Sequence, residues 1–347
     1  MPSSVDNRVP ADWEPVERVW LAWPHNRDTW PGSENGTPRF DRIELVYLDL
    51  IRKIAPHARV GVLASGNVAQ RAAEMTQGID AVDLFNVPTN DAWMRDYGPT
   101  FVASRSTGEL HAVNWRYNAW GGKYPPWDDD DKAAARIAER LGMKCVSSRL
   151  TLEGGSVDFD GDHRMLTTPG CLLVDSRNPG WTKEQVCREI YEQLGVTEIV
   201  WVDGGGLDGD DTDGHIDQVA RFIDKRNLVV AVADEDDPNH DGLRQNLKQL
   251  ELWGASTYPQ VTVHPLRIPP PRFIDSTRVP ESYCNYLRLG RDQILMPSFG
   301  ASTDDEAAEV LADVSGAQIT RVDCRDLVWG LGSLHCCSRE QPAVRPK

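Results

Sequence analysis

Apolar residues recur along the chain at two spacings, one typical of helices and one typical of short buried strands. Between residues 40 and 54, Ile43, Tyr47, Leu50 and Ile54 follow one another at intervals of three or four. This spacing places them on one face of a helix. Further helices are predicted over residues 67–77, 128–141, 182–194, 241–252 and 303–314.

Polar residues mark the start of three of these helices. Thr182 with Gln185 has the spacing of a capping box, and so does Thr303 with Glu306. Four consecutive aspartates at residues 128–131 precede a third helix. Negative charge is favourable at a helix N-terminus, so these four carboxylates are assigned no ligand.

Short apolar runs between turn signals predict the strands. They lie at residues 17–24, 60–65, 82–88, 101–102, 111–118, 197–202, 215–224, 227–233, 261–269, 283–290, 293–300 and 319–324, with two or three more inside 156–176. The segment NAWGGKYPPW (118–127) is predicted to be a loop at the rim of a pocket. Strands alternate with helices without a low-complexity linker, which predicts an α/β protein with one domain over residues 1–347.

Three glycine-rich turns resemble one another. LEGGSVD (152–158), VDGGGLD (202–208) and WGLGSLH (329–335) each continue into an apolar residue and then Asp or His. Such an echo fits a radial array of similar units whose corresponding turns meet at a centre.

The composition narrows the class of partner. Of 347 residues, 40% are hydrophobic and 26% are charged, which is ordinary for a soluble globular protein, and the formal net charge is -16. So acidic a chain is poorly suited to bind nucleic acid or an anionic membrane, whereas its field attracts cations. Solubility alone also explains the charge.

The seven cysteines are scattered and odd in number, which does not resemble a small disulfide scaffold. No basic stretch followed by an apolar segment opens the chain, and no run of about 18 apolar residues exists. These features predict a protein of the reducing cytoplasm, where a thiol can stay free.

One cysteine is a candidate nucleophile. Cys336 ends the turn GLGSLHCC, where the glycines allow a sharp bend. A buried, inert thiol is the alternative. Because the unperturbed pKa of cysteine is about 8.5, an active thiol needs a base or a favourable site. His335 adjoins it, but neighbours on a strand point to opposite faces.

Other polar groups suit the same site. His215 and Asp217 in DGHID would share one face of a strand, because they are two residues apart. Glu153 beside Gly154 could orient an imidazole, and Asp96 lies in a tight turn after Trp93. Several carboxylates around one thiol match a guanidinium, which they grip with paired hydrogen bonds. As alternatives, each acid could be a loop or ion-pair residue and DGHID a plain turn before a strand.

The sequence favours no metal site. DTDGHID resembles a loop for a hard cation, but with Gly214 at position 6 an EF-hand would have Gly209 at position 1 and Ala220 at position 12. The cysteines and histidines near the C-terminus lack the paired spacing of zinc ligands.

Eight motifs in order make the chain resemble the agmatine deiminase family, which includes the bacterial type of peptidylarginine deiminase. They are ERVWLAWP, NDAWMRDYGPTFV, NAWGGKYPPWD, LEGGSVDFDGDHRMLTT, DGHIDQVARF, YCNYL, MPSFG and GLGSLHC. The resemblance extends from about residue 13 to residue 342. It implies a pentein fold, in which five ββαβ-like units surround a pseudo-fivefold axis, and hydrolysis of agmatine to N-carbamoylputrescine and ammonia without cofactor or metal.

The resemblance also implies roles. Cys336 falls on the family's nucleophile, His215 on the general acid/base and Glu153 on the acid beside it, while Asp96 and Asp217 fall on the carboxylates that bind the guanidinium. The substrate-pocket positions are Trp93, Trp120, Gly121 and Gly122. The chain departs from the family at Ser333, where Asn is frequent, and at Cys337, where an aliphatic residue is usual; Cys337 is expected to point into the core.

The implied mechanism runs through a covalent thiouronium on the cysteine, and the implied partner is a small cation, agmatine, with a homo-oligomer left open. Free or peptidyl arginine is the nearest alternative substrate. Transfer of the amidino group to an amine is a second alternative, and a non-catalytic polyamine-binding protein is a third. The pathway, polyamine synthesis or agmatine catabolism, also stays open.

Overall fold

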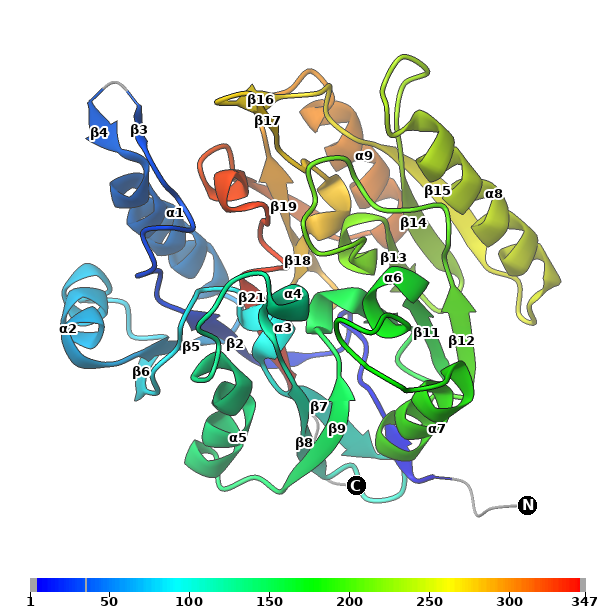
Figure 1. The fold of residues 1–347 in the computed structure, drawn as a ribbon, viewed down its shortest axis with the longest axis horizontal. Coiled ribbons are helices and arrows are strands. Elements are labelled where there is room, and N and C mark those ends of the chain that lie inside the picture. Colours follow the sequence, from blue (N-terminus) through cyan, green and yellow to red (C-terminus); the bar gives the residue numbers. More distant parts are fainter. Residues whose placement is uncertain (1–4, 35, 344–347) are drawn as a thin grey trace.

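The computed structural model describes residues 5–34 and 36–343, and within them five sheets of three or four strands surround a centre. Figure 1 shows the larger helices on the outside of this ring. Each sheet repeats one pattern: two antiparallel strands, a helix, and a third strand parallel to the second. This is the predicted ββαβ-like unit.

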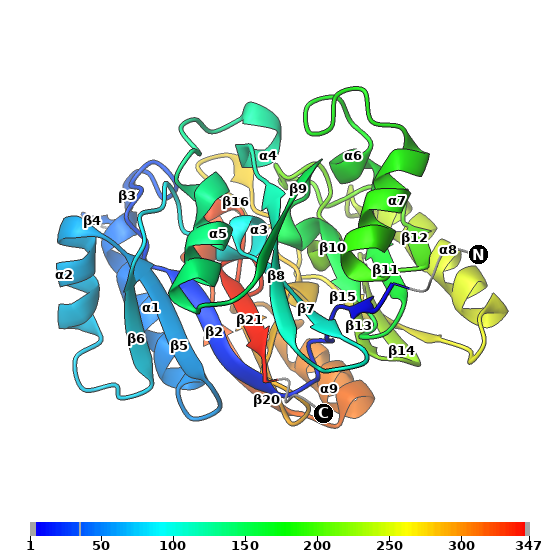
Figure 2. The same ribbon diagram turned by 90° about the horizontal axis from the view of Figure 1, so that it is seen from below.

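The first unit joins the two ends of the chain. β21 (Ser338–Pro342) pairs antiparallel with β2 (Val16–Ala22), and β5 (Arg59–Ala64) lies parallel to β2 after helix α1 (Arg39–Ile54). After helix α2 (Gly66–Met75), strand β6 (Val82–Asn86) pairs parallel with β5 and extends this sheet. Figure 2 shows β21 in red beside β2 in blue.

The other four units follow in chain order. The second has β7 (Thr100–Ser104), β8 (Leu110–Arg116), α5 (Asp130–Arg140) and β9 (Cys145–Thr151), with β1 (Asn7–Arg8) paired to β7. The third has β10 (Val157–Phe159), β11 (Arg164–Thr167), α7 (Lys183–Leu194) and β12 (Glu198–Trp201). The fourth has β13 (Ala220–Asp224), β14 (Asn227–Val232), α8 (His240–Ser256) and β15 (Thr262–Arg267). The fifth has β18 (Leu287–Arg288), β19 (Gln293–Ser298), α9 (Asp304–Ser315) and β20 (Gln318–Asp323).

Short elements fill the connections. They are the hairpins β3 (Ser33–Glu34)–β4 (Thr37–Pro38) and β16 (Phe273–Ile274)–β17 (Thr277–Arg278), the single turns α3 (Met94–Tyr97), α4 (Ala119–Gly122) and α6 (Pro169–Leu172), and the 3-10 turns η1 (Gly154–Ser156), η2 (Ile216–Gln218), η3 (Tyr283–Asn285) and η4 (Leu327–Gly330).

Apolar burial fixes the helices against the ring. The predicted face of α1 is confirmed, since Ile43, Tyr47, Leu50 and Ile54 are all buried. The capping box of Thr182 is present at α7. The one at Thr303 is wrong: its hydroxyl lies 2.8 Å from the Tyr283 hydroxyl instead of capping α9, because a tertiary contact competes for it.

Two predicted strands are shorter than expected. Residues 215–219 are not strand, because η2 occupies them and β13 begins at Ala220. Likewise η3 occupies the start of 283–290, and β18 covers only Leu287–Arg288. Both turns bring side chains to the centre of the ring.

A turn of this kind precedes the first strand of every unit, and we call the five segments the site turns. They are α3 before β7, η1 before β10, η2 before β13, η3 before β18, and residues 333–337 before β21. Two of the glycine echoes belong to them. The third, 202–208, does not: Gly204 and Gly206 border an open surface cavity with Gly242 of α8.

Candidate active site

The site turns bring the five predicted polar residues together at the centre of the ring. Asp96 comes from α3, Glu153 immediately precedes η1, His215 immediately precedes η2, Asp217 lies in η2, and Cys336 lies before β21. Each side chain is almost fully buried. Residues up to 240 positions apart in the sequence therefore form one cluster.

The thiol of Cys336 is held by Asn285 of η3. Asn285 Nδ2 donates to Cys336 Sγ at 3.1 Å, and Asn285 Oδ1 accepts the backbone N–H groups of His335 and Cys336 at 3.1 and 3.2 Å. Sequence reasoning missed Asn285, although it lies in the motif YCNYL. Sγ also lies 3.6 Å from Asp217 Oδ2.

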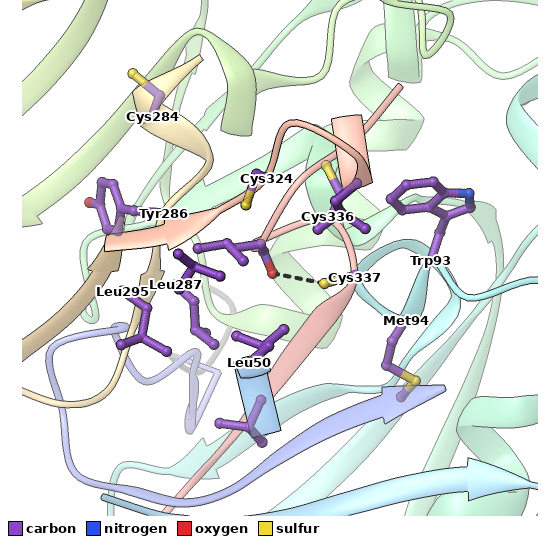
Figure 3. Packing of buried hydrophobic residues seen from close by; sticks show 14 of the residues in the cluster. Leu50, Trp93, Met94, Cys284, Tyr286, Leu287, Leu295, Cys324, Cys336 and Cys337 are labelled. Carbon is purple, nitrogen blue, oxygen red and sulfur yellow. Dashed lines mark hydrogen bonds between the residues drawn. The ribbon is translucent and has the colours of Figure 1, made fainter. Parts of the chain in front are cut away.

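Cys337 points the other way, as predicted. Figure 3 shows the two sulfur atoms directed oppositely, with Trp93 beside Cys336. Cys337 is fully buried and its Sγ lies 3.4 Å from the carbonyl oxygen of Leu334. Of the two neighbouring thiols, Cys336 is therefore the one that borders a cavity, which supports it as the candidate nucleophile.

His215 lies among carboxylates. Its Nε2 donates to Glu153 Oε2 at 3.2 Å, and its Nδ1 lies 3.6 Å from Asp96 Oδ1 without a hydrogen-bond partner among the described residues. Burial opposes a charge on the ring, but Asp96, Glu153 and Asp217 outweigh it and raise the pKa of His215 to about 10. The imidazole is therefore charged at neutral pH.

Glu153 is fixed in turn by Arg177, which sequence reasoning also missed. Arg177 Nε donates to Glu153 Oε1 at 3.0 Å, and its Nη2 donates to the carbonyl oxygen of Thr212 at 3.0 Å. Arg177 also forms an ion pair with Asp213. No local pattern around Arg177 indicated this role, since its partners lie 24 and more residues away.

Asp96 accepts two hydrogen bonds. One comes from Trp120 Nε1 at 3.0 Å and the other from the backbone N–H of Gly155 at 2.9 Å. Burial raises the pKa of Asp96 to about 6, opposed by the charge of His215 and reinforced by the other carboxylates. Above that pH it offers a full negative charge.

Asp217 is ionised more readily. Burial opposes its charge, yet the hydrogen bond from His335 and the nearby cations hold the pKa of Asp217 below its ordinary value. His335 Nδ1 donates to Asp217 Oδ2 at 2.8 Å, while Oδ1 has no hydrogen-bond partner within the described chain. Residues 334–337 form a turn and not the strand that was assumed, but the printed contacts of Cys336 Sγ are with Asn285 and Asp217 and not with the His335 ring.

Gly155 leaves room for this arrangement. A Cβ atom there would lie 2.5 Å from His215 Nδ1 and 2.8 Å from Asp96 Oδ1, distances that real Cβ atoms do not show. The absence of a side chain lets the backbone N–H approach Asp96 closely.

A cavity of about 260 Å³ opens onto Cys336 and Asp96. Its apolar walls include Trp93, Trp120 and Trp329, and it is bordered by the carboxylates of Asp28, Asp91 and Asp211. No lysine or arginine borders it in the part of the chain that the structure describes.

The segment 118–127, which was predicted to be a loop at a pocket rim, shapes one side of this cavity. Trp120 borders the cavity, whereas Gly121 faces Ser176 and Arg177, with a φ of +85° that favours glycine. Tyr124, also at the cavity, bonds to Asp211 Oδ2 at 2.5 Å and so joins the segment to the loop before η2.

Two groups of side chains have the donor atoms of a metal site. They are Glu153, Cys171 and His215, and Asp12, His335 and Glu340. Arg177 already pairs with Glu153, and Arg95 Nη2 lies 2.5 Å from Glu340 Oε2. These arginines neutralise charge that a metal ion would need, so we assign neither group a metal.

A search of the described helices finds none with the length and apolar character to span a membrane.

Comparison with known proteins places these observations in a family context. Residues 8–342 match the family model of the Porphyromonas-type peptidyl-arginine deiminases. The agmatine deiminase of Pseudomonas aeruginosa (strain LESB58) is 32% identical over 364 residues, which cover 97% of this chain and 96% of that protein. The agmatine deiminase of Ectopseudomonas mendocina is 31% identical over 360 residues, covering 96% and 95%.

Solved structures give the same picture. An agmatine deiminase of C. jejuni with substrate bound has a TM-score of 0.87 at 27% identity and covers 97% of both chains. The agmatine deiminase of Enterococcus faecalis has a TM-score of 0.88 at 28% identity, covering 99% of this chain and 98% of that one. The predicted pentein fold is confirmed.

Proposed function

The chain belongs to the Porphyromonas-type peptidyl-arginine deiminase family, and from this we propose that it is an agmatine deiminase that hydrolyses agmatine to N-carbamoylputrescine and ammonia. The observation that carries the proposal is the position of Cys336 Sγ, 3.6 Å from one buried carboxylate and beside a second, at the end of a cavity bordered by further acids.

The carboxylates suit a guanidinium group. Asp96 and Asp217 are buried, and Asp217 Oδ1 is without a hydrogen-bond donor among the described residues. A buried acceptor of this kind is costly unless a donor reaches it. A guanidinium offers planar N–H donors and a positive charge to both acids, and would hold its central carbon against the thiol.

Substrate also helps the nucleophile. Burial, together with the charges of Asp217 and Asp96, raises the pKa of the Cys336 thiol well above its ordinary value. A guanidinium between the same two carboxylates neutralises that charge and favours the thiolate. The nucleophile is thus formed where the substrate cation is bound.

In the first half-reaction the Cys336 thiolate forms a bond to the guanidinium carbon. The charged His215 gives its proton to the leaving nitrogen, the C–N bond breaks, and ammonia departs. The enzyme is left with an S-alkylthiouronium on Cys336 and a neutral His215. Glu153, held by Arg177, keeps the ring in place.

In the second half-reaction the neutral His215 takes a proton from water, which attacks the same carbon. The C–S bond breaks, the Cys336 thiolate leaves, and the ureido product forms as the remaining hydroxyl proton passes to solvent, where the released ammonia becomes ammonium. The proton that His215 gave to ammonia is replaced by the proton taken from water, so the ring returns to its charged state. The chain's own residues suffice for every step, and we assign no cofactor.

The acidic border of the cavity favours agmatine over arginine. Agmatine carries a second positive charge at its far end, whereas free arginine carries a carboxylate that needs a basic partner. Asp28, Asp91 and Asp211 border the cavity, and no basic side chain of the described residues does. Peptidylarginine has no charge at that point and is the second candidate, because the matching family model bears its name.

The other readings have less support. An amidinotransferase would need an acceptor amine, and would show turnover that rises with amine concentration. A non-catalytic polyamine-binding protein has no need of a thiol, a charged histidine and Asn285 in one cluster. We further propose a cytoplasmic enzyme, since all seven cysteines of the described chain are free thiols.

Mass spectrometry after mixing with agmatine, with ammonia measured in parallel, tests the proposal. We expect ammonia release and a trapped adduct on Cys336. Cys336→Ser should bind agmatine without releasing ammonia, whereas Cys337→Ser should keep turnover. An adduct on Cys337 would contradict the assigned nucleophile, and activity on peptidylarginine alone would replace the substrate.

A further inference from the structure

A layer of charged side chains lies directly behind the candidate active site, and we call it the rear layer. It contains Asp12, Arg95, Asp158, Arg221 and Glu340. Arg221 is fully buried, and it pairs with Asp158 at 2.6 Å and with Asp12. A small cavity of about 40 Å³ borders Asp12, Arg95, Asp158 and Glu340, and also His335.

His335 stands between this layer and the reacting groups. Its Nδ1 lies 2.8 Å from Asp217 Oδ2 and its Nε2 lies 3.8 Å from Asp12 Oδ2. The proposed mechanism gives His335 no task, although it is 98% buried and bonded to a substrate-binding carboxylate.

We propose that His335 is a positioning residue, which fixes Asp217 so that Oδ1 faces the substrate guanidinium while Oδ2 is held beside Cys336. An ionised carboxylate only accepts hydrogen bonds, so the ring must carry its proton on Nδ1. The backbone N–H of His335 is held separately by Asn285 Oδ1 at 3.1 Å. The backbone contact thus leaves Nδ1 of the ring to donate to Asp217, while Nε2 faces Asp12.

The charges around His335 suit a neutral donor. Asp217 and Asp12 face the ring nitrogens, Glu340 lies nearby, and Arg221 and Arg95 stand on the rear side. Burial and the two arginines lower the pKa of His335. A neutral ring orients Asp217 without cancelling its charge, so the carboxylate keeps its full attraction for a cation.

The inference rests on the proposed function, because His335 acts through Asp217. Two conservative variants separate its nitrogens. In His335→Asn the side-chain amide can replace Nδ1 and still donate to Asp217, whereas in His335→Gln the amide replaces Nε2 and reaches toward Asp12. His335→Ala removes both.

The test measures steady-state ammonia release from agmatine, and the melting temperature, for wild type and for the three His335 variants. We expect kcat/KM of His335→Asn within about 3-fold of wild type, and losses of about 30-fold or more in His335→Gln and His335→Ala, chiefly through a higher KM. A merely structural role would instead make kcat/KM follow the melting temperature.

Three results would overturn the inference. One is an alanine variant as active as wild type, and another is an asparagine variant no better than glutamine. The third is a wild-type protein that neither binds agmatine nor releases ammonia, which would remove the proposed function as well. Only in that third case do both proposals fail together.

Discussion

The cavity side of the site and the rear layer each contain a buried histidine, and the two histidines ionise in opposite senses. Burial disfavours the charge on both. Around His215 the neighbours are carboxylates, Asp96 and Glu153 foremost, and they raise its pKa to about 10. Around His335 the charge of Arg221 adds to burial and the pKa falls. At His335 burial, the largest cause, acts together with the arginines and outweighs the contacts with Asp12 and Asp217. At His215 no arginine adds to burial, and the carboxylates outweigh it.

This difference assigns the two rings different work. His215 holds a proton at neutral pH and has one nitrogen, Nδ1, directed at the space beside Asp96. The pKa of His335 is lowered by burial and by the arginines, and its Nδ1 lies 2.8 Å from Asp217 Oδ2. In the proposed mechanism the same type of side chain therefore has two roles, an acid that donates a proton and a fixed donor that orients a carboxylate.

The largest test of the comparison removes the acid. His215→Gln should lower kcat by about 10³-fold, since general acid/base catalysis is typically worth 10²- to 10⁴-fold. His335→Asn should stay near wild type. The rate of ammonia release at saturating agmatine measures both, and equal losses in the two variants would contradict the separate roles.

A smaller loss is expected from crowding the cavity side. In Gly155→Ala the new Cβ would lie 2.5 Å from His215 Nδ1, so kcat/KM should fall by about 100-fold as the ring or Asp96 shifts. Gly180→Ala is the control: its φ of +74° strains alanine, but nothing lies within 4 Å. It should lower the melting temperature without changing kcat/KM; a loss of activity there would point to general instability.

The pH dependence sharpens the comparison further. Asp96 must be ionised, so kcat/KM should rise through about pH 6, and His215 must be charged, so it should fall through about pH 10. Glu153→Gln removes a contact that raises the pKa of His215, so the alkaline limb should move down by about one pH unit, which still leaves the ring charged at neutral pH.

Glu189→Gln is the matched control for that pH profile. Glu189 lies in α7, and its carboxylate accepts a hydrogen bond from Ser148 and not from His215. It should leave both limbs in place. An alkaline limb that stays near pH 10 in Glu153→Gln would show that Glu153 does not support the charge of His215.

The sequence predicted which residues come together better than it predicted the local backbone structure that presents them. His215 and Asp217 were expected on one strand face, yet a 3-10 turn presents them. The interval of two residues is compatible with both, and the strong β-pattern after Ala220 extended the predicted strand too far. The radial arrangement followed from the family resemblance, with the glycine echo only in partial agreement.

Asn285, Arg177 and the role of His335 were missed for a common physical reason. Each acts through partners far along the chain, and none stands in a local pattern that requires it; Asn285 and Cys336, for example, are 51 positions apart. The turn at Thr303 makes the same point, since Tyr283 takes the hydroxyl that a local rule assigned to α9.

The smallest expected effect concerns the outer border of the cavity. Asp211→Asn removes one negative charge at the cavity and weakens the bond to Tyr124, so KM for agmatine should rise about 3-fold while kcat is unchanged. Asp208→Asn, on the same loop but with its side chain largely exposed and outside this cavity, removes the same charge and should have no effect on KM.

If both variants raised KM equally, the long-range field of the acidic chain would account for the attraction of the cation, and the carboxylates at the cavity would not. Added salt separates the two explanations, since a field across solvent is screened within about 8 Å at 0.15 M, whereas a contact at the partly buried border is screened less. A KM that rises in Asp211→Asn alone, and persists at high salt, would assign recognition of the far amine to the cavity side itself.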